Sequence, residues 1–361
     1  MLQNNHSMRH LSSILLLFLP FIILSQNIAE DEIFASLFPT KEQSEVACYR
    51  IPALVTSPNG VLIAAIDERV PNCNDLRAND DINIVIRTSK DNGKTWSAIN
   101  KIVDYPIGRS ASDPSFIVDT ITNTLFLFFN YMDLVNENGI YYLKVMESKD
   151  DGLTWSTPKD ITKQITKQEW KKDFQFITSG RGIQTKSGRL LHTLVNLQQG
   201  LHVFESNDHG KRWQLIDTPI LPGDESKIIE LSDGTWMINS RVAEAGCRYV
   251  HHSTDQGKTW ETSIDSTLID PACNASILSY KDPKTNKEIL LFSNAHSPNK
   301  RENLSICVSY DQGKTWPKKT TIYKGSAAYS TMTILPDGDI GIFFEKDDYS
   351  DNVFIKIPFN D

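Results

Sequence analysis

The octet SKDNGKTW occupies residues 89–96, and close copies of it occur four more times along the chain. All five follow the pattern Ser-x-Asp-x-Gly-x-Thr-Trp, except that Arg212 replaces the Thr in the third copy. The other copies are SKDDGLTW at residues 148–155, SNDHGKRW at 206–213, STDQGKTW at 253–260 and SYDQGKTW at 309–316. Repetition at an interval of about 50–60 residues indicates an array of one supersecondary unit.

The octet is typical of a tight turn between two strands. Its Asp can accept hydrogen bonds from backbone N–H groups two residues on, and its Gly tolerates the positive φ that such turns need. The Thr and Trp suit the strand that leaves the turn, and we expect the Trp to pack between neighbouring units. We therefore interpret the octet as a structural staple, since Asp-x-Gly turns are too common to indicate a ligand site.

A second kind of turn alternates with the octets. Each of its six instances is a polar turn followed by an apolar strand, as in SPNGVLIAAI and LPDGDIGIFFE. Helical periodicity is nearly absent, and TKQITKQEWKK is the best candidate for a helix. Six units of about four strands each predict an all-β fold, a six-bladed β-propeller with five octet hairpins. The sixth unit lacks an octet, so we expect an N-terminal strand to close its sheet. A β-solenoid is the alternative fold to the propeller.

Length and composition place the chain among globular proteins. It has 361 residues and a formal charge of −8, which excludes basic nucleic-acid binders and disordered acidic tails. Near the N-terminus, an apolar run at residues 14–24 follows Arg9 and His10. Because this run is too short to span a bilayer, residues 1–29 are predicted to be a signal peptide that exports a protein without a membrane span. Residues 30–361 would then form one propeller domain, in a compartment that depends on the host.

Three arginines lie in or beside apolar strands, namely Arg50 in CYRIPALV, Arg241 in MINSRVAEAG and Arg301 in NKRENLSICV. A guanidinium in such a position is costly unless it is paired. Arginines from different units of a ring could converge on its axis, where their planar groups would hold a carboxylate, sulfate or phosphate. Taken singly, each could instead be a surface or salt-bridged residue.

These segments resemble the sialidases. The octets match the Asp-box of that family, and YRIPAL matches its Arg-Ile-Pro motif. The segments DESKIIELSDGTWMINSR, SPNKRENLSICVSYDQGKTW and AAYSTMTILPDGDIGIFFE are similar to those of secreted bacterial and lysosomal exo-α-sialidases. The match runs in order from about Cys48 to the C-terminus. Because unrelated propellers also use the Asp-box, the ordered set carries the resemblance.

The resemblance implies a group of substrate-binding residues. Arg50, Arg241 and Arg301 match the arginines that bind the carboxylate of sialic acid, and Glu345 matches the glutamate that orients Arg50. Arg69 resembles a further pocket arginine, near the glycerol side chain or O4 of the sugar. No metal or other cofactor is implied.

The resemblance also implies three catalytic residues: Tyr329 as nucleophile, Glu225 as its base and Asp75 as acid/base, with Asp80 and Asp81 as rivals of Asp75. Sialic acid carries a carboxylate on its anomeric carbon, so an anionic nucleophile would be repelled in a dry pocket. A tyrosine can approach neutral and lose its proton to Glu225 as it attacks. Asp75 would protonate the leaving oxygen and later activate water, with retention at the anomeric carbon.

A disulfide could fix the loop that carries Asp75. Cys48 lies two residues before Arg50, and Cys73 lies two residues before Asp75. If Arg50 and Asp75 share a pocket, the two segments meet, and a Cys48–Cys73 disulfide would hold the loop against the arginine strand. Further possibilities are a second bridge, with one unpaired thiol, and five reduced, buried cysteines. The second bridge would join Cys247 to Cys273 and leave Cys307 free.

The implied function is a retaining exo-α-sialidase, a monomer that hydrolyses terminal α-linked sialic acids from glycoproteins, glycolipids or oligosaccharides. A catalytically inactive sialic-acid-binding propeller would need only the arginines, so the presence of Tyr329, Glu225 and Asp75 favours the enzyme. A trans-sialidase would need an acceptor platform, often aromatic, and the sequence does not show one.

Overall fold

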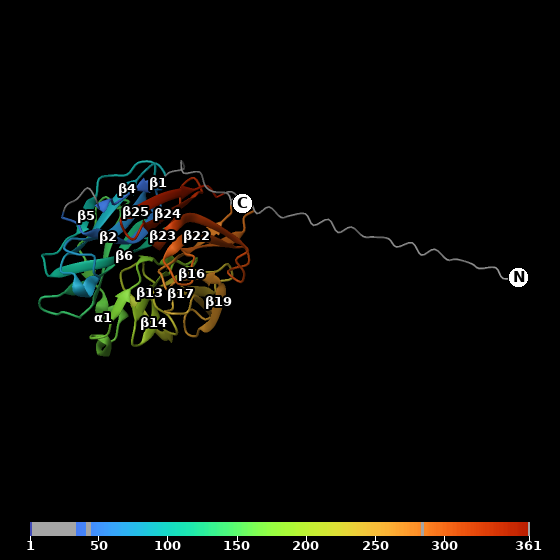
Figure 1. Ribbon diagram of the computed structural model, residues 1–361. Coiled ribbons are helices and arrows are strands. Elements are labelled where there is room, and N and C mark those ends of the chain that lie inside the picture. Colours follow the sequence, from blue (N-terminus) through green and yellow to red (C-terminus); the bar gives the residue numbers. More distant parts are fainter. Residues whose placement is uncertain (2–33, 41–44, 283–284, 360–361) are drawn as a thin grey trace.

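In a computed structural model the chain consists almost entirely of β-strands (Figure 1). The structure describes residues 34–40, 45–282 and 285–359, together with Met1. The predicted signal peptide, residues 1–29, lies outside the described residues apart from Met1. In the part of the chain that is described, no helix is both long and apolar enough to cross a membrane.

The described strands form five sheets, in which most neighbours are antiparallel. The sheet nearest the N-terminus contains β2 (Cys48–Thr56), β3 (Leu62–Arg69), β4 (Ile82–Ser89) and β5 (Asn100–Val103). The next contains β6 (Arg109–Asp119), β7 (Thr124–Asp133), β8 (Tyr142–Ser148) and β9 (Lys159–Asp160), with β11 (Gly180–Arg181) parallel to β6. The third contains β10 (Gln175–Ile177), β12 (Ile183–Gln184), β13 (Leu190–Asn196), β14 (Gly200–Ser206) and β15 (Gln214–Ile220).

The remaining strands form a four-stranded and a seven-stranded sheet. The smaller contains β16 (Ser226–Glu230), β17 (Trp236–Ser240), β18 (Cys247–Ser253) and β19 (Glu261–Ile269). The larger contains β20 (Ser276–Lys281), β21 (Glu288–Ala295), β22 (Glu302–Ser309), β23 (Lys318–Ile334), β24 (Ile340–Lys346), β25 (Asp351–Ile357) and β1 (Phe34–Ser36). The helical segments with both ends among the described residues are α1 (Thr162–Ile165) and the 3₁₀ turns η2 (Leu76–Ala78) and η3 (Gln168–Trp170). The helix expected in TKQITKQEWKK is confirmed as α1 followed by η3.

The sheets are arranged as in a propeller, and the all-β prediction is confirmed. Strands of different sheets meet, since β2 contacts β6 and β23, and β16 contacts β20. The N-terminal strand β1 pairs with β25, with Phe34 opposite Ile355 and Ser36 opposite Val353. Figure 1 shows this closure as blue β1 beside red β25. The expected pairing of an N-terminal strand with the last sheet is therefore confirmed.

The octets form hairpin turns through a shared set of hydrogen bonds. In the first copy, Ser89 Oγ accepts from the N–H of Gly93 at 2.9 Å, and Asp91 Oδ1 accepts from the N–H of Thr95 at 2.9 Å. The Asp therefore bonds an N–H four residues on, not two as predicted, because the Gly adopts a φ of 85° that folds Thr95 back onto it. The same Gly and Asp contacts recur in the third copy, where Arg212 donates its backbone N–H to Asp208.

The octets also join neighbouring sheets. The Trp96 ring lies 5.1 Å from that of Phe354 in β25, and the Trp213 ring lies 5.7 Å from that of Phe126 in β7. A Cβ on Gly93 would lie 2.1 Å from the Phe354 ring, so glycine is required there by contact as well as by φ. The prediction that Trp packs between units is confirmed for these two copies.

Candidate active site

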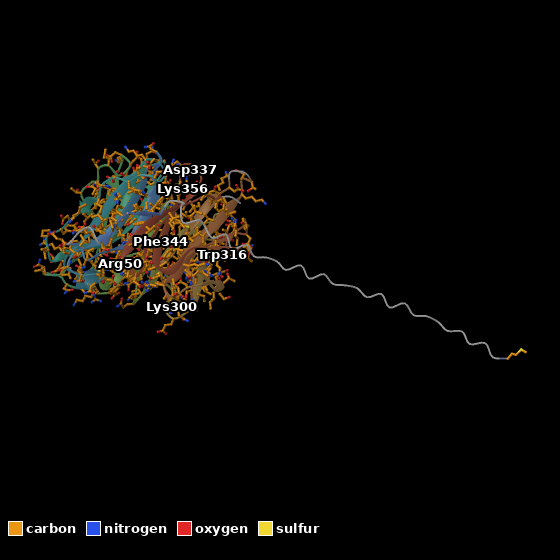
Figure 2. The ribbon with its side chains drawn as sticks, turned by 45° about the horizontal axis from the view of Figure 1, so that its top comes forward. Arg50, Lys300, Trp316, Asp337, Phe344 and Lys356 are labelled. Carbon is orange, nitrogen blue, oxygen red and sulfur yellow. A yellow bond between two sulfur atoms is a disulfide. The ribbon has the colours of Figure 1, made fainter. Side chains whose placement is uncertain are left out.

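A cavity of about 380 Å³ is lined by residues of β2, β6, β10 and β23 and of the segments that flank β16, β17 and β22. No octet residue lines it, which agrees with the structural interpretation of the octets. The exposed residue Lys300, which precedes the lining residue Arg301, lies at the edge of the molecule in Figure 2. Most of the residues proposed from the sequence converge on this cavity: Arg50, Asp75, Glu225, Arg241, Arg301 and Tyr329.

Irregularities in three strands direct side chains into the cavity. The pairing register shifts between Arg50 and Ala53 in β2, between Ser112 and Ser115 in β6, and between Ala327 and Ser330 in β23. A β-bulge of this kind re-aims a side chain away from the regular alternation of a strand. The cavity-lining residues of these strands, Tyr329 among them, lie at or inside the shifts.

The proposed nucleophile and its base are in direct contact. The Tyr329 hydroxyl donates to Glu225 Oε2 at 2.7 Å, and Arg241 Nη1 bonds the same carboxylate oxygen and also donates to the Tyr329 hydroxyl at 3.1 Å. Glu225 precedes β16 and Arg241 follows β17, and the Arg241 N–H donates to the Glu225 carbonyl at 3.1 Å, so backbone pairing places the two side by side. Burial, and then the Glu225 charge, raise the pKa of Tyr329 well above its ordinary value. Tyr329 is therefore neutral in the free protein.

Glu345 on β24 connects Arg50 to the strand of Tyr329. Its Oε1 accepts from Arg50 Nε at 2.6 Å and from the Ile51 N–H at 2.9 Å, and its Oε2 accepts from the Tyr329 N–H at 3.1 Å. The Glu345 side chain is fully buried and lies behind the cavity. One carboxylate thus contacts both the Arg50 side chain and the backbone of Tyr329, and the sequence did not indicate the second contact.

The loop after β3 brings Asp75 to the cavity. Asp75 is highly exposed, and its Oδ1 accepts from Arg69 Nη1 at 2.8 Å. Asp80 and Asp81, the alternatives for the acid/base residue, do not line the cavity. Asp81 instead accepts from Asn83 Nδ2 at 3.1 Å. Of the three aspartates, only Asp75 has access to a ligand in this cavity.

Arg69 occupies a different place from the one that the resemblance implied. It is fully buried and does not line the cavity. Its Nη1 donates to the carbonyl oxygens of Cys73 and Asn74 at 2.9 and 3.1 Å, and its Nη2 bonds Asp67 at 3.0 Å. In this structure Arg69 holds the Asp75 loop from behind.

A disulfide also fixes this loop. Cys48 and Cys73 are bonded, with their Cα atoms 5.8 Å apart, and this pairing confirms the prediction. Cys247, Cys273 and Cys307 are free, so the second bridge is wrong. Cys273 is instead buried in an apolar cluster with Tyr329.

Asp113, which lines the cavity, contacts the buried carboxylate of Asp67, and the sequence did not indicate this contact. Asp67 Oδ1 accepts from the Asp113 N–H at 2.9 Å, and its Oδ2 accepts from the Ser112 hydroxyl at 2.6 Å. Asp113 lines the cavity, has a φ of 64° and accepts from Asn130 Nδ2 at 2.9 Å. Burial, and then the neighbouring Asp67 charge, raise the pKa of Asp113. A register shift and a positive φ create this contact, so no local sequence motif predicts it.

One wall of the cavity is aromatic. The ring centroids of Tyr141 and Phe174 lie 5.0 Å apart, and those of Phe174 and Phe176 lie 5.8 Å apart. The Arg77 guanidinium lies 5.3 Å from the Phe174 centroid. All four residues line the cavity. The sequence does not show this wall, because its members come from separate segments.

A family model described as a BNR repeat-like domain matches residues 76–342, which is more than half of the chain. The chain belongs to the BNR repeat-like family. This BNR repeat-like chain is 37% identical over 328 residues to a sialidase from Micromonospora viridifaciens, covering 82% of this chain and 50% of that protein. A sialidase from Bacteroides fragilis is 30% identical over 331 residues, covering 83% of this chain and 60% of the relative.

A solved structure gives the same result. A Hadza microbial sialidase matches with a TM-score of 0.78 at 27% identity, covering 86% of this chain and 66% of that one. The BNR repeat-like chain spans about half of the length of the first of these relatives and less than two thirds of the second. The resemblance to sialidases is confirmed.

Proposed function

We propose that this chain is an exo-α-sialidase that hydrolyses terminal α-linked sialic acids from glycoproteins, glycolipids or oligosaccharides. The observation that carries the proposal is the hydrogen bond of 2.7 Å between the Tyr329 hydroxyl and Glu225, in a cavity that three arginines also line. The arginines suit an anionic sugar, and the buried tyrosine suits attack beside a carboxylate.

The proposed reaction proceeds with retention. Arg50, Arg241 and Arg301 bind the sugar carboxylate. The Tyr329 oxygen attacks the anomeric carbon as its proton passes to Glu225, and Asp75 protonates the departing glycosidic oxygen. Asp75 then takes a proton from water, whose oxygen attacks the same carbon. The bond between that carbon and the Tyr329 oxygen breaks, and the proton on Glu225 returns to Tyr329. The arginine charges hold the substrate carboxylate throughout.

We propose a six-bladed propeller as the architecture. β23 supports this division of the largest sheet, because it pairs with β22 up to Ser326 and with β24 from Ala327 onward. A second cavity, of about 560 Å³, gives further support. Its lining includes residues of β2, β6, β12, β16, β20 and β23, which fits an inner strand from each of six blades, together with Arg181 of β11 and Glu288 of β21.

Sialyl transfer is the second candidate function, and the aromatic wall at Phe174 favours it because a flat ring can support an acceptor sugar. The two functions differ in their products. Incubation with a sialoside and an excess of an asialo-oligosaccharide gives only free sialic acid if the enzyme hydrolyses. A new sialylated acceptor would instead indicate transfer.

We further propose that residues 1–29 direct export and that the mature chain is a monomer. N-terminal sequencing of protein recovered outside the cytoplasm should begin near residue 30. Light scattering should give the mass of one chain. A retained residue 1 in exported protein would contradict the first proposal, and a dimer mass the second.

The decisive test of the activity is hydrolysis of a fluorogenic sialoside by the purified protein. The variant Tyr329→Phe should lose at least about 100-fold in kcat while it still binds sialic acid. Nuclear magnetic resonance of the first product should show the α-anomer of the free sugar. An inactive wild-type protein that binds sialic acid would support the binding propeller, and a fully active Tyr329→Phe would contradict the assigned nucleophile.

A further inference from the structure

Tyr349 contacts two of the three cavity arginines at once. The Arg50 guanidinium lies 3.8 Å from the centroid of the Tyr349 ring, and Arg301 Nη1 donates to the Tyr349 hydroxyl at 3.1 Å. Tyr349 itself does not line the cavity. It lies in the turn between β24 and β25.

The turn that presents Tyr349 has an unusual backbone. Asp347, Asp348 and Tyr349 have φ values of 50°, 53° and 69°, so three successive residues other than glycine adopt the left-handed conformation. Each such residue costs free energy, and this strain persists only where the surroundings enforce it. The backbone conformation that places Tyr349 therefore costs stability, and neighbouring contacts must enforce it.

Neighbouring groups hold the strained turn in place. The Asp347 N–H donates to the Ser326 carbonyl at 2.9 Å, and the Asp348 N–H donates to Ser326 Oγ at 3.0 Å. Ser326 Oγ donates in turn to Asp348 Oδ1 at 2.7 Å, and the Tyr323 hydroxyl bonds Asp347. The turn is therefore rigid enough to fix the Tyr349 ring.

A phenol suits this place because it is neutral. Two guanidinium groups that converge on one ligand carboxylate repel each other in the empty site. Glu345 neutralises Arg50 in part, whereas Arg301 forms no ion pair with a carboxylate among the described residues. The Tyr349 ring offers its π face to Arg50 and its hydroxyl oxygen to Arg301, which holds both cations without cancelling their charge. A carboxylate there would compete with the substrate.

We propose that Tyr349 is a positioning residue that pre-organises Arg50 and Arg301 for the carboxylate of the substrate. This inference rests on the proposed function. Its consequence is kinetic: Tyr349 contributes to substrate binding through the arginines and takes no part in bond breaking. Loss of the residue should raise KM and leave kcat nearly unchanged, because the nucleophile and its base are anchored elsewhere.

Two substitutions separate the contacts of Tyr349. Tyr349→Phe removes the hydroxyl bond to Arg301 and keeps the stacking on Arg50, and should raise KM by about 3–10-fold. Tyr349→Leu removes both contacts and should raise KM by about 10–100-fold. Tyr105→Phe is the matched control, because it removes a phenol hydroxyl that accepts from a cation, Lys144 Nζ at 3.2 Å, and Tyr105 does not line the cavity. Its KM should equal that of the wild type.

The measurements are kcat and KM for a fluorogenic sialoside, the melting temperature, and the Kd for sialic acid by calorimetry. A graded rise in KM and Kd from Tyr349→Phe to Tyr349→Leu, with Tyr105→Phe unchanged, supports the inference. Wild-type KM and Kd in Tyr349→Phe, or an equal rise in Tyr105→Phe, overturns it. If Tyr349→Leu does not fold, the other two variants decide.

The two proposals fail in different ways. If the wild-type protein binds sialic acid without cleaving it, the proposed activity fails and the Kd values alone test Tyr349. If it cleaves normally and Tyr349→Phe matches it, the activity stands and the role of Tyr349 is wrong. If the wild type neither binds nor cleaves, both are wrong.

Discussion

The Tyr329 hydroxyl lies 2.7 Å from Glu225 Oε2, although the two residues are 104 positions apart in the chain. They come from different sheets, on β23 and just before β16. The contact pairs a neutral phenol with a carboxylate that can take its proton, and Arg241 touches both groups. This arrangement suits a nucleophile that is activated only as it attacks.

Replacement of the base should slow the reaction without unfolding the protein. We expect Glu225→Gln to lower kcat by about 10²–10⁴-fold, because the amide cannot accept the Tyr329 proton. Steady-state kinetics provide the measurement. Glu230→Gln is the control, since Glu230 ends the same strand and lines the second cavity. Equal losses in the two variants would contradict the assignment of Glu225.

Loss of the Glu345 charge should affect both stability and binding. Glu345→Gln leaves Arg50 partly buried without its partner and should lower the free energy of unfolding by about 3–5 kcal/mol. Urea denaturation and KM would be measured together. Glu147→Gln, which removes a partner of the more exposed Lys159, should cost less than about 1 kcal/mol. A Glu345→Gln protein as stable as the wild type would show that the Arg50 contact is weak.

The role of Asp75 can be tested through the leaving group. A sugar alcohol needs a proton as it departs, whereas an acidic phenol does not. Asp75→Asn should therefore lower the rate with a natural sialoside by about 10²–10⁴-fold and the rate of the first step with an acidic aryl sialoside far less. Asp80→Asn and Asp81→Asn should match the wild type with both substrates. A selective loss in either control would reassign the acid.

The buried lysine Lys227 should make stability depend on pH. It is 3% exposed, its Nζ donates to Asn274 Oδ1 at 2.6 Å, and burial lowers its pKa from 10.5 to about 7. Between these values the unfolded chain holds more protons than the folded one, so the contribution of Lys227 to the free energy of unfolding rises with pH.

Urea unfolding at pH 6.5 and pH 9 would measure this effect. The rise over this interval should be smaller in Lys227→Met than in the wild type by roughly 2 kcal/mol. Parallel pH dependences for the two proteins would show that Lys227 is not perturbed.

The octets should matter for folding and not for chemistry. Ser253 is buried, accepts from the Gly257 N–H at 2.7 Å and donates to Asp255 at 2.8 Å. Ser253→Ala should lower the free energy of unfolding by about 1 kcal/mol. The specific activity of the folded fraction should equal that of the wild type. Reduced activity at unchanged stability would contradict the staple interpretation.

The repeat, the all-β class and six of the residues that line the cavity could be predicted from the sequence. The octet turn can be predicted because its contacts are local. They join Ser89, Asp91, Gly93 and Thr95, which lie within eight positions of one another. The arginines could be singled out because a guanidinium beside an apolar strand is costly unless it is paired. The Cys48–Cys73 disulfide followed from the expectation that Arg50 and Asp75 share one cavity.

The contacts that hold those side chains in place could be found only from the tertiary structure. Arg69 bonds the backbone of the loop that carries Asp75, and Asp113 lies beside Asp67. The second contact depends on the φ of Asp113 and on the register shift in β6, which residue types do not predict. Tyr349 reaches two arginines through three left-handed residues that a turn of aspartates gives no reason to expect. Strand register and positive φ are set by packing between sheets, so such contacts exist only once the whole ring has assembled.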